Sequence, residues 1–406
     1  MTAARRRLVI VALAATLAIH AAVGVAASLA TIDPNPDFRR YYEIASGVGR
    51  PYVDYPVEHP IGTFALFKVL ARGGADGAAF AARLVTVNVA ADAIIVVAIA
   101  WAFGPLAALA YALIALPLLG LALNRVDLLS TACATIAVAA WHRERPSAAA
   151  LAIAAGTAFK LWPLLFAVLL CVPPAGRMRP RVRLAPLATL FAAALAIGGV
   201  WWLIAGATGP YAVVTFRRAH GWQIESLAGA VIHLAHVQPA RLESGAYRTG
   251  WMPSWLSIAM LATAAPLSMW AVARNVARGR IGTAWLAGVA TLLVLSPLLS
   301  AQYVFWLAPG AAFAWVEGDR RHATIAVAVI VLTDVFWNFY GSVITADVTA
   351  VLIVVARNAV LSVLAISAWR AASRQPGTPQ TSDRHTSDPV PRRAYRLLPM
   401  RRTPRG

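Results

Sequence analysis

The residues best suited to chemistry in this chain are carboxylic acids gathered near its N-terminal end. Six of its seventeen acidic residues fall in one stretch, directly after an apolar run over residues 8–30. A carboxylate at the edge of a membrane has its pKa raised by apolar surroundings and still meets hydroxyl groups from water. Asp37, a few positions beyond the apolar run, is therefore the candidate general base. The six acids are Asp33, Asp37, Glu43, Asp54, Glu58 and Asp76.

Each of these acids also has a simpler interpretation. The stretch Asp37-Phe-Arg-Arg-Tyr41-Tyr42-Glu43 would start a short helix well with Asp37 as its N-cap, and Asp33 before a proline favours a turn. Around Glu58 and His59, aromatic rings lie close to the acids. Such rings suit the faces of a sugar, and they equally suit an aromatic belt at the membrane interface. Tyr41, Tyr42, Glu58 and His59 are the sugar- or acceptor-binding candidates of this region.

A second polar group, over residues 211–226, contains Arg217, Arg218, His220, Gln223 and Glu225. Two arginines on the outer side of a membrane oppose the usual orientation bias, so an anionic partner is expected there. Guanidinium groups match phosphate with paired hydrogen bonds, which makes the two arginines and His220 candidates for binding a phosphate. The alternative is an ion pair with the acids of the first loop. Gln223 and Glu225 are candidates for contacting a sugar or acceptor.

Three further candidates occupy short turns. Lys160 lies between two short apolar runs, where a lysine either binds a ligand or extends its ammonium group to the interface. We include it among the phosphate-binding candidates. Gln302 and Tyr303 close another turn and can line a binding site.

Composition identifies the class of protein. The chain has 406 residues, of which 60% are hydrophobic and 13% charged, which indicates an all-α polytopic membrane protein. The net charge of +19 would suggest nucleic acid in a soluble protein, but here the arginines gather in short loops and in the C-terminal tail, which predicts retention on the cytoplasmic side. No nucleic-acid partner, metal or cofactor is therefore expected. The cysteines Cys133 and Cys171 and the histidines His233 and His236 do not have the spacing of a metal-binding motif.

Loop charges predict about twelve transmembrane helices over residues 1–372, with both termini in the cytoplasm. Two larger outer loops cover 31–79, with a surface helix near His59–Arg72, and 206–252. The polar, basic segment 373–406 is predicted to be a disordered cytoplasmic tail. The apolar runs are 8–30, 80–103, 105–123, 127–141, 146–159, 161–173, 185–205, 253–273, 281–298, 303–316, 323–340 and 348–369.

The segment between the basic loops near residues 145 and 177 must cross the membrane twice in this topology. Each crossing then has about fourteen residues, or ~21 Å of helix, which is shorter than a hydrocarbon core of ~30 Å. The sequence therefore predicts a break at Lys160-Leu-Trp-Pro163.

The ordered set of these motifs resembles glycosyltransferase family 87, within the GT-C superfamily. The resemblance covers nearly the whole membrane region. It rests on Asp37-Phe-Arg-Arg-Tyr41, Tyr52…Tyr55-Pro…His59-Pro60, Asn124…Asp127, Phe159-Lys160-Leu-Trp-Pro163, Trp222-Gln223-Ile-Glu-Ser226 and Ser296-Pro…Ser300-Ala-Gln302-Tyr303…Trp306. The resemblance implies a GT-C-type bundle with a catalytic aspartate in the first outer loop, matching Asp37. It also implies a polyprenyl-phosphate-mannose donor in place of a nucleotide-sugar. One departure is His59-Pro60-Ile61, where the family usually has paired prolines.

The expected function is transfer of a hexose, foremost mannose, from a polyprenyl-phosphate donor to a lipid or glycolipid acceptor. The reaction is expected on the extracytoplasmic face of the plasma membrane by inverting single displacement, because a lipid phosphate leaves without a general acid. The main alternative is a lipid-linked sugar flippase or transporter, which would place ionisable residues near mid-membrane in two repeated halves. A non-catalytic membrane scaffold is a further alternative.

Overall fold

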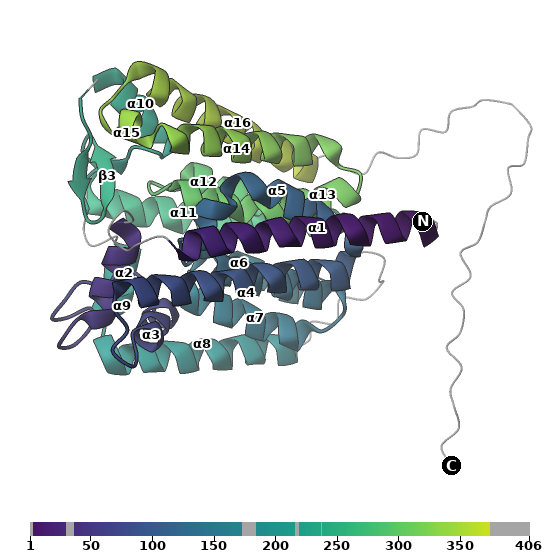
Figure 1. The fold of residues 1–406 in the computed structure, drawn as a ribbon, viewed down its shortest axis with the longest axis horizontal. Helices are drawn as coiled ribbons and strands as arrows, with labels where there is room; N and C mark the ends of the chain where they lie inside the picture. The colour runs from purple at the N-terminus through teal and green to yellow at the C-terminus, as the bar shows by residue number, and fades with distance from the viewer. Residues whose placement is uncertain (1–2, 30–35, 173–183, 216–218, 237, 374–406) are drawn as a thin grey trace, which may run out of the picture. The chain divides into compact units, whose positions relative to one another are not determined.

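A computed structural model describes residues 3–29, 36–172, 184–215, 219–236 and 238–373. The described chain is almost entirely helical (Figure 1). Within the described ranges, six helices are long and apolar enough to cross a membrane, which makes the chain a multi-pass membrane protein. Shorter apolar helices pack among them, and the predicted number of about twelve spans stays a prediction. The six long helices are α1 (Ala3–Ser28), α4 (Gly77–Phe103), α5 (Pro105–Leu123), α8 (Leu184–Ala205), α11 (Ser254–Val276) and α16 (Val348–Ser373).

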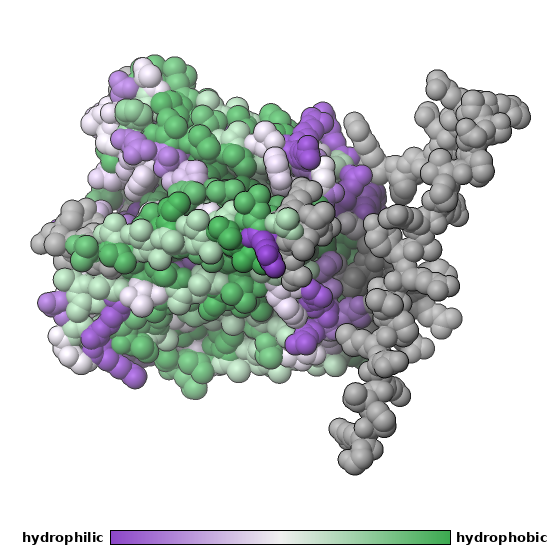
Figure 2. All heavy atoms as spheres, turned by 45° about the vertical axis from the view of Figure 1, so that its right-hand side comes forward, coloured by the Kyte–Doolittle hydropathy of each residue, from purple (hydrophilic) through white to green (hydrophobic). Residues whose placement is uncertain are grey.

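The surface of the described helices fits a bilayer. Figure 2 shows a broad hydrophobic band along the helices, with hydrophilic residues gathered towards the two ends. Side chains such as Phe191, Leu195 and Leu203 on α8 are exposed although they are apolar. In water such a surface would cost free energy, whereas hydrocarbon solvates it.

Short elements gather at one end of the long helices, which we call the loop end (Figure 1). The short elements are α2 (Pro36–Ser46), α3 (Ile61–Leu70), α9 (Thr208–Val214), α10 (Leu227–His236), α15 (Tyr340–Ile344) and a three-stranded antiparallel sheet. The sheet was not anticipated from the sequence. Its strands are β1 (Trp222–Gln223), β3 (Ala246–Thr249) and β2 (Arg241–Glu243), in that order, with Trp222 opposite Thr249 and Arg241 opposite Arg248.

The bundle interior is completed by helices of intermediate length. They are α6 (Asp127–His142), α7 (Pro146–Phe159), the 3₁₀ helix η1 (Trp162–Cys171), α12 (Ile281–Leu295), the 3₁₀ helix η3 (Ala301–Trp306), α13 (Leu307–Val316) and α14 (Arg320–Asn338). Tight connections join many of them to their neighbours. Gly104 between α4 and α5 has φ 90°, a left-handed value that glycine adopts without strain, and a proline follows at the first turn of α5.

The predicted break at Lys160 is present. Helix α7 ends at Phe159, and Lys160 is extended, with φ −151° and ψ 146°. Pro163, in the first turn of η1, cannot continue a helical hydrogen-bond ladder, so the chain restarts as a 3₁₀ helix. A helix, α3, is also present where the surface helix was predicted and is ten residues long, and its place at the outer membrane surface stays a prediction. The predicted tail, 373–406, lies outside the described residues except for Ser373, which ends α16.

Candidate functional site

Asp37 forms an ion pair with Arg125 at the loop end. Asp37 lies in the first turn of α2, which begins at Pro36, so it is inside the helix and is not its N-cap. Its side chain is 35% exposed, whereas that of Arg125 is 8% exposed. A carboxylate in this first turn also complements the positive end of the helix dipole. The structure therefore sets a partly accessible carboxylate against a buried cation.

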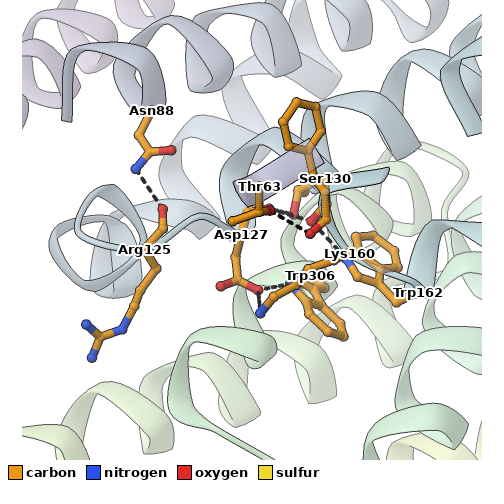
Figure 3. Close-up of polar contacts among 10 residues, drawn as sticks. Thr63, Asn88, Arg125, Asp127, Ser130, Lys160, Trp162 and Trp306 are labelled. Carbon is orange, nitrogen blue, oxygen red and sulfur yellow. Dashed lines mark hydrogen bonds and ion pairs between the residues drawn. The ribbon is translucent and has the colours of Figure 1, made fainter. Parts of the chain in front are cut away.

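Arg125 belongs to the short connection between α5 and α6, and helix α4 fixes that connection. The Asn88 side-chain amide donates hydrogen bonds to the main-chain oxygens of Leu123, at 2.7 Å, and Arg125, at 2.6 Å (Figure 3). The guanidinium lies 5.9 Å from the ring of Trp337. Burial alone would lower the pKa of Arg125, but Asp37 and neighbouring acids raise it above its ordinary value. Its Nε atom is buried and has no hydrogen-bond partner among the described residues.

A second buried ion pair joins Asp127, two residues after Arg125, to Lys160. Asp127, 1% exposed at the start of α6, accepts hydrogen bonds at Oδ1 from Lys160 Nζ, at 2.7 Å, and from Trp306 Nε1, at 3.0 Å (Figure 3). The Lys160 ammonium also lies 4.1 Å from the centroid of the Tyr303 ring. Lys160 therefore contacts a carboxylate and aromatic rings, and α3 supports its position. Thr63 Oγ1 on α3 donates to the Phe159 oxygen at 2.8 Å.

A third acid, Glu225, follows β1 and is 1% exposed. We call Asp37, Asp127 and Glu225, with the cations Arg125, Lys160 and Arg357, the cluster. Burial raises the pKa of Glu225 to about 7, although Arg357 and a hydrogen bond from Tyr340 act in the opposite direction. The Arg357 side chain, fully buried on α16, donates to the main-chain oxygen of Glu225 at 2.9 Å. Arg125 also interacts electrostatically with Glu225. Arg125 therefore interacts with two acids, Asp37 through an ion pair and Glu225 electrostatically.

The other candidates of the first outer loop mainly hold that loop together. Tyr41 is buried, with its ring stacked on Phe67 at 4.8 Å and against His59 at 5.4 Å. Its hydroxyl group interacts electrostatically with Asp37 and Arg125, and burial together with Asp37 raises its pKa well above the ordinary value. The Tyr42 hydroxyl group donates to the Ala75 oxygen at 3.2 Å. The Glu58 carboxylate accepts hydrogen bonds from Arg40 Nε and Nη2, at 3.0 Å each.

The second outer loop is described in part. Arg217 and Arg218 lie outside the described residues, so their predicted role in binding a phosphate stays a prediction. His220 is exposed and is held through its main-chain N–H, which donates to Glu243 at 2.6 Å. Gln223 is buried in β1, and Gln302 is half-buried in η3 beside Tyr303.

Sequence reasoning missed the cation that the structure places against Asp37. Arg125 and Asp127 fall within the Asn124…Asp127 motif, but neither was among the predicted site residues. The available signal was that Asn-Arg-Val-Asp follows directly on an uninterrupted apolar run, where charges are costly unless paired. Arg357 gave the same signal inside the last apolar run.

Comparison of the chain with models of known protein families found no match, and comparison with curated proteins found none. Among the described residues, no group of three His, Cys, Asp or Glu side chains could hold a metal ion. Both cysteines are free, Cys133 half-buried and Cys171 exposed. The chemistry of the cluster therefore has to be argued from its own side chains.

Proposed function

We propose that the chain is a membrane glycosyltransferase that moves a hexose, foremost mannose, from a polyprenyl-phosphate donor to a lipid or glycolipid acceptor. The observation that carries this proposal is the pairing of Asp37 with Arg125, a partly exposed carboxylate against a buried guanidinium with one N–H unpartnered. A carboxylate can accept a proton from an acceptor hydroxyl group, and a guanidinium can hold a phosphate. Inverting single displacement needs a base on one face of the anomeric carbon and a cation for the phosphate that leaves from the other face, and this pair supplies one group of each kind.

In the proposed reaction, the Asp37 carboxylate takes the proton of the acceptor hydroxyl group as its oxygen attacks the anomeric carbon. The bond between this carbon and the donor phosphate oxygen breaks, and its electron pair leaves with the polyprenyl phosphate. The configuration at the anomeric carbon is inverted. A positioned base contributes on the order of 10²–10⁴ in rate. The buried guanidinium of Arg125 faces little competing water, which strengthens its attraction for the charge that develops on the phosphate.

The charges of the cluster favour an exchange of partners during this cycle. Its three acids are each beside a cation: Asp37 with Arg125, Asp127 with Lys160, and Glu225 with Arg357. Arg125 and Lys160 are therefore already paired without a donor, and a donor phosphate must compete with a carboxylate for either of them. Arg125 is the cation whose partner is the most exposed, because Asp37 is 35% exposed and Asp127 is 1% exposed. A phosphate that takes Arg125 removes this cation from Asp37, whose carboxylate then acts as the base.

The other residues support the cluster or extend it. Lys160 is held by Asp127 and by the Tyr303 ring. In the proposal it therefore does not contact the donor phosphate directly but attracts it electrostatically from a greater distance than Arg125. Tyr41, Glu225 and Tyr303 lie beside the paired charges and are the candidates for contacting a sugar. Arg217, Arg218 and His220 complete the proposed phosphate site from the second outer loop.

For the topology, we propose about twelve passes, with the loop end outside the plasma membrane and both termini in the cytoplasm. The shorter helices α6, α7, η1, α12, α14 and the η3–α13 pair would supply the passes beyond the six long helices. Their connections opposite the loop end carry Arg143 and Arg145, Arg274 to Arg280, and Arg320 and Arg321, in keeping with the positive-inside rule.

A transporter is the second candidate, favoured by a buried ionisable pair within the long helices. His20 on α1 contacts Asp92 on α4 through Nδ1 at 2.6 Å and the Ala112 oxygen through Nε2 at 2.9 Å, and the Tyr111 hydroxyl group donates to Asp92 at 2.7 Å. Buried intramembrane charges often mark transport pathways. Here, however, both ring nitrogens and both carboxylate oxygens have partners, which suits a fixed contact between α1, α4 and α5.

The deciding experiment supplies membranes containing the protein with radiolabelled polyprenyl-phosphate-mannose and an extract of the host lipids. Label in a new glycolipid is expected for the unchanged protein and for Asp54→Asn, a control acid in the same loop that contacts the Arg50 N–H. Asp37→Asn should abolish that product while the protein is still inserted. Movement of the donor between leaflets without a new product would favour the transporter, and full transfer by Asp37→Asn would remove Asp37 from the role of base.

A further inference from the structure

A second polar constellation lies opposite the loop end, around Trp101 near the end of α4. The guanidinium carbons of Arg143 and Arg145 are 5.6 and 5.5 Å from the centroid of the Trp101 ring, which is 41% exposed. By comparison, Trp270 near the end of α11 contacts the single arginine Arg274, at 5.7 Å. Among the described residues, Trp101 is the tryptophan with two.

The backbone holds these two arginines in a fixed turn. The N–H of Arg145 donates to the Ala140 oxygen at 2.8 Å, and the N–H of Glu144 donates to the Trp141 oxygen at 3.0 Å. This pattern closes the end of α6 as a Schellman motif, with Glu144 in the left-handed region at φ 62°. Pro146 then starts α7 and fixes the exit of the chain. Arg143 and Arg145 are therefore presented together without a further loss of backbone entropy.

An apolar groove leads away from Trp101 along the outside of α4. Its volume is about 320 Å³, and it is lined by Ala93, Ile94, Val97, Ala98, Trp101 and Ile136. From Ala93 to Trp101 the groove follows eight residues of helix, or ~12 Å at ~1.5 Å per residue. A groove of this composition, in a helix that lies in hydrocarbon, suits part of an acyl chain. Its charged end at Trp101 suits the head group of the same molecule.

We propose that the Arg143–Arg145 turn and this groove bind one anionic glycerophospholipid in the leaflet opposite the loop end. The phosphate would lie between the two guanidinium groups, and one acyl chain would follow α4 from Trp101 towards Ala93. With the exposed Glu144 between them, the two arginines give the turn a net charge of +1. This charge matches a head group with a single negative charge better than a zwitterionic one. The bound lipid ties α4 to the α6–α7 turn, so it stabilises the bundle independently of the cluster at the loop end.

The test titrates phosphatidylglycerol or phosphatidylcholine onto the purified protein in detergent and counts bound lipids by native mass spectrometry. The unchanged protein should bind one phosphatidylglycerol with higher affinity than phosphatidylcholine. Arg143→Ala and Arg145→Ala should each weaken that binding about fivefold, since a basic residue near a membrane surface contributes about 1 kcal/mol. Arg274→Ala is the matched control, because it removes an arginine from a tryptophan without the second arginine or the groove, and it should change nothing.

Two results would overturn the proposal. One is an equal affinity for both lipids, and the other is an equal loss in the variants and in the Arg274→Ala control, which would indicate only a general layer of lipid around the protein. Fluorescence localises the site independently of any arginine variant. Phosphatidylglycerol with brominated acyl chains should quench the unchanged protein more than Trp101→Phe, and identical quenching of the two would place the lipid elsewhere.

Discussion

Replacement of Asp37 by asparagine is expected to strengthen the binding of polyprenyl phosphate and to slow the transfer reaction. If a donor phosphate must take Arg125 from Asp37, removal of the carboxylate removes a competitor for the guanidinium. Asp37→Asn should therefore bind polyprenyl phosphate, the proposed leaving group, more tightly than the unchanged protein. The same variant should lose on the order of 10²–10⁴ in transfer rate, because no base remains for the acceptor hydroxyl group.

The magnitude follows from the burial of the two side chains. Two unit charges 4 Å apart attract by about 4 kcal/mol at an effective dielectric constant of about 20, but exposed pairs contribute only about 0.2–1 kcal/mol. With Asp37 35% exposed and Arg125 8% exposed, this pair lies between these limits. An intermediate attraction of about 1–2 kcal/mol corresponds to a gain in phosphate affinity of about five- to thirtyfold.

The assay measures binding of polyprenyl phosphate, without sugar, by the change in intrinsic fluorescence of the purified protein in detergent. Asp54→Asn is the control for charge in the same loop and should leave the affinity unchanged. Arg125→Ala should weaken binding both alone and together with Asp37→Asn. Weaker binding by Asp37→Asn than by the unchanged protein would refute the exchange of partners. If transfer were nevertheless lost in that variant, the proposed role of Asp37 as base would survive without the exchange.

Three further predictions concern the supporting residues. The folded protein holds the proton of Glu225 more tightly than the unfolded chain, because the pKa of Glu225 is about 7 against an ordinary 4.5. The resulting contribution to the free energy of unfolding is complete below about pH 4.5 and is lost as the pH rises through 7. At ~1.4 kcal/mol per pKa unit this is about 3 kcal/mol, and Glu225→Gln should flatten the fall in melting temperature over that range, whereas an unchanged fall would contradict the assignment. Asp127→Asn should lower the free energy of unfolding by about 3–5 kcal/mol by leaving the Lys160 charge buried alone, and adding Lys160→Met should restore part of it in thermal unfolding; simple addition of the two losses would refute the coupling. Gly62→Val should reduce transfer in the membrane assay, because a Cβ atom at position 62 would lie 2.7 Å from the Ala158 oxygen and push α3 from α7; full activity would show that this contact does not position Lys160.

The sequence predicted the features that depend on local patterns. Apolar runs and composition identified a multi-pass helical membrane protein, because hydrocarbon requires long apolar helices whose backbone groups are satisfied internally. The break at Lys160 was readable because the apolar segment between the basic loops near residues 145 and 177 has to turn back within the membrane. A short helix at α3 was readable because its apolar run is too short to span a membrane. The small sheet was not, since strands of two to four residues carry too little pattern.

Tertiary structure alone decided which charges face one another. Asp37 on α2 and Arg125 after α5 are separated in the chain by the three helices α3, α4 and α5. The Arg357 side chain meets the main-chain oxygen of Glu225 across 132 positions. Hydropathy shows where each charge sits along its own segment, but it carries no information on the rotation and neighbours of the helices in the bundle. The sequence thus determined that acids and arginines lie at the ends of apolar helices. Only packing decided that a buried guanidinium from the α5–α6 connection would be the partner of Asp37, because long-range contacts depend on how side chains fill the space between helices.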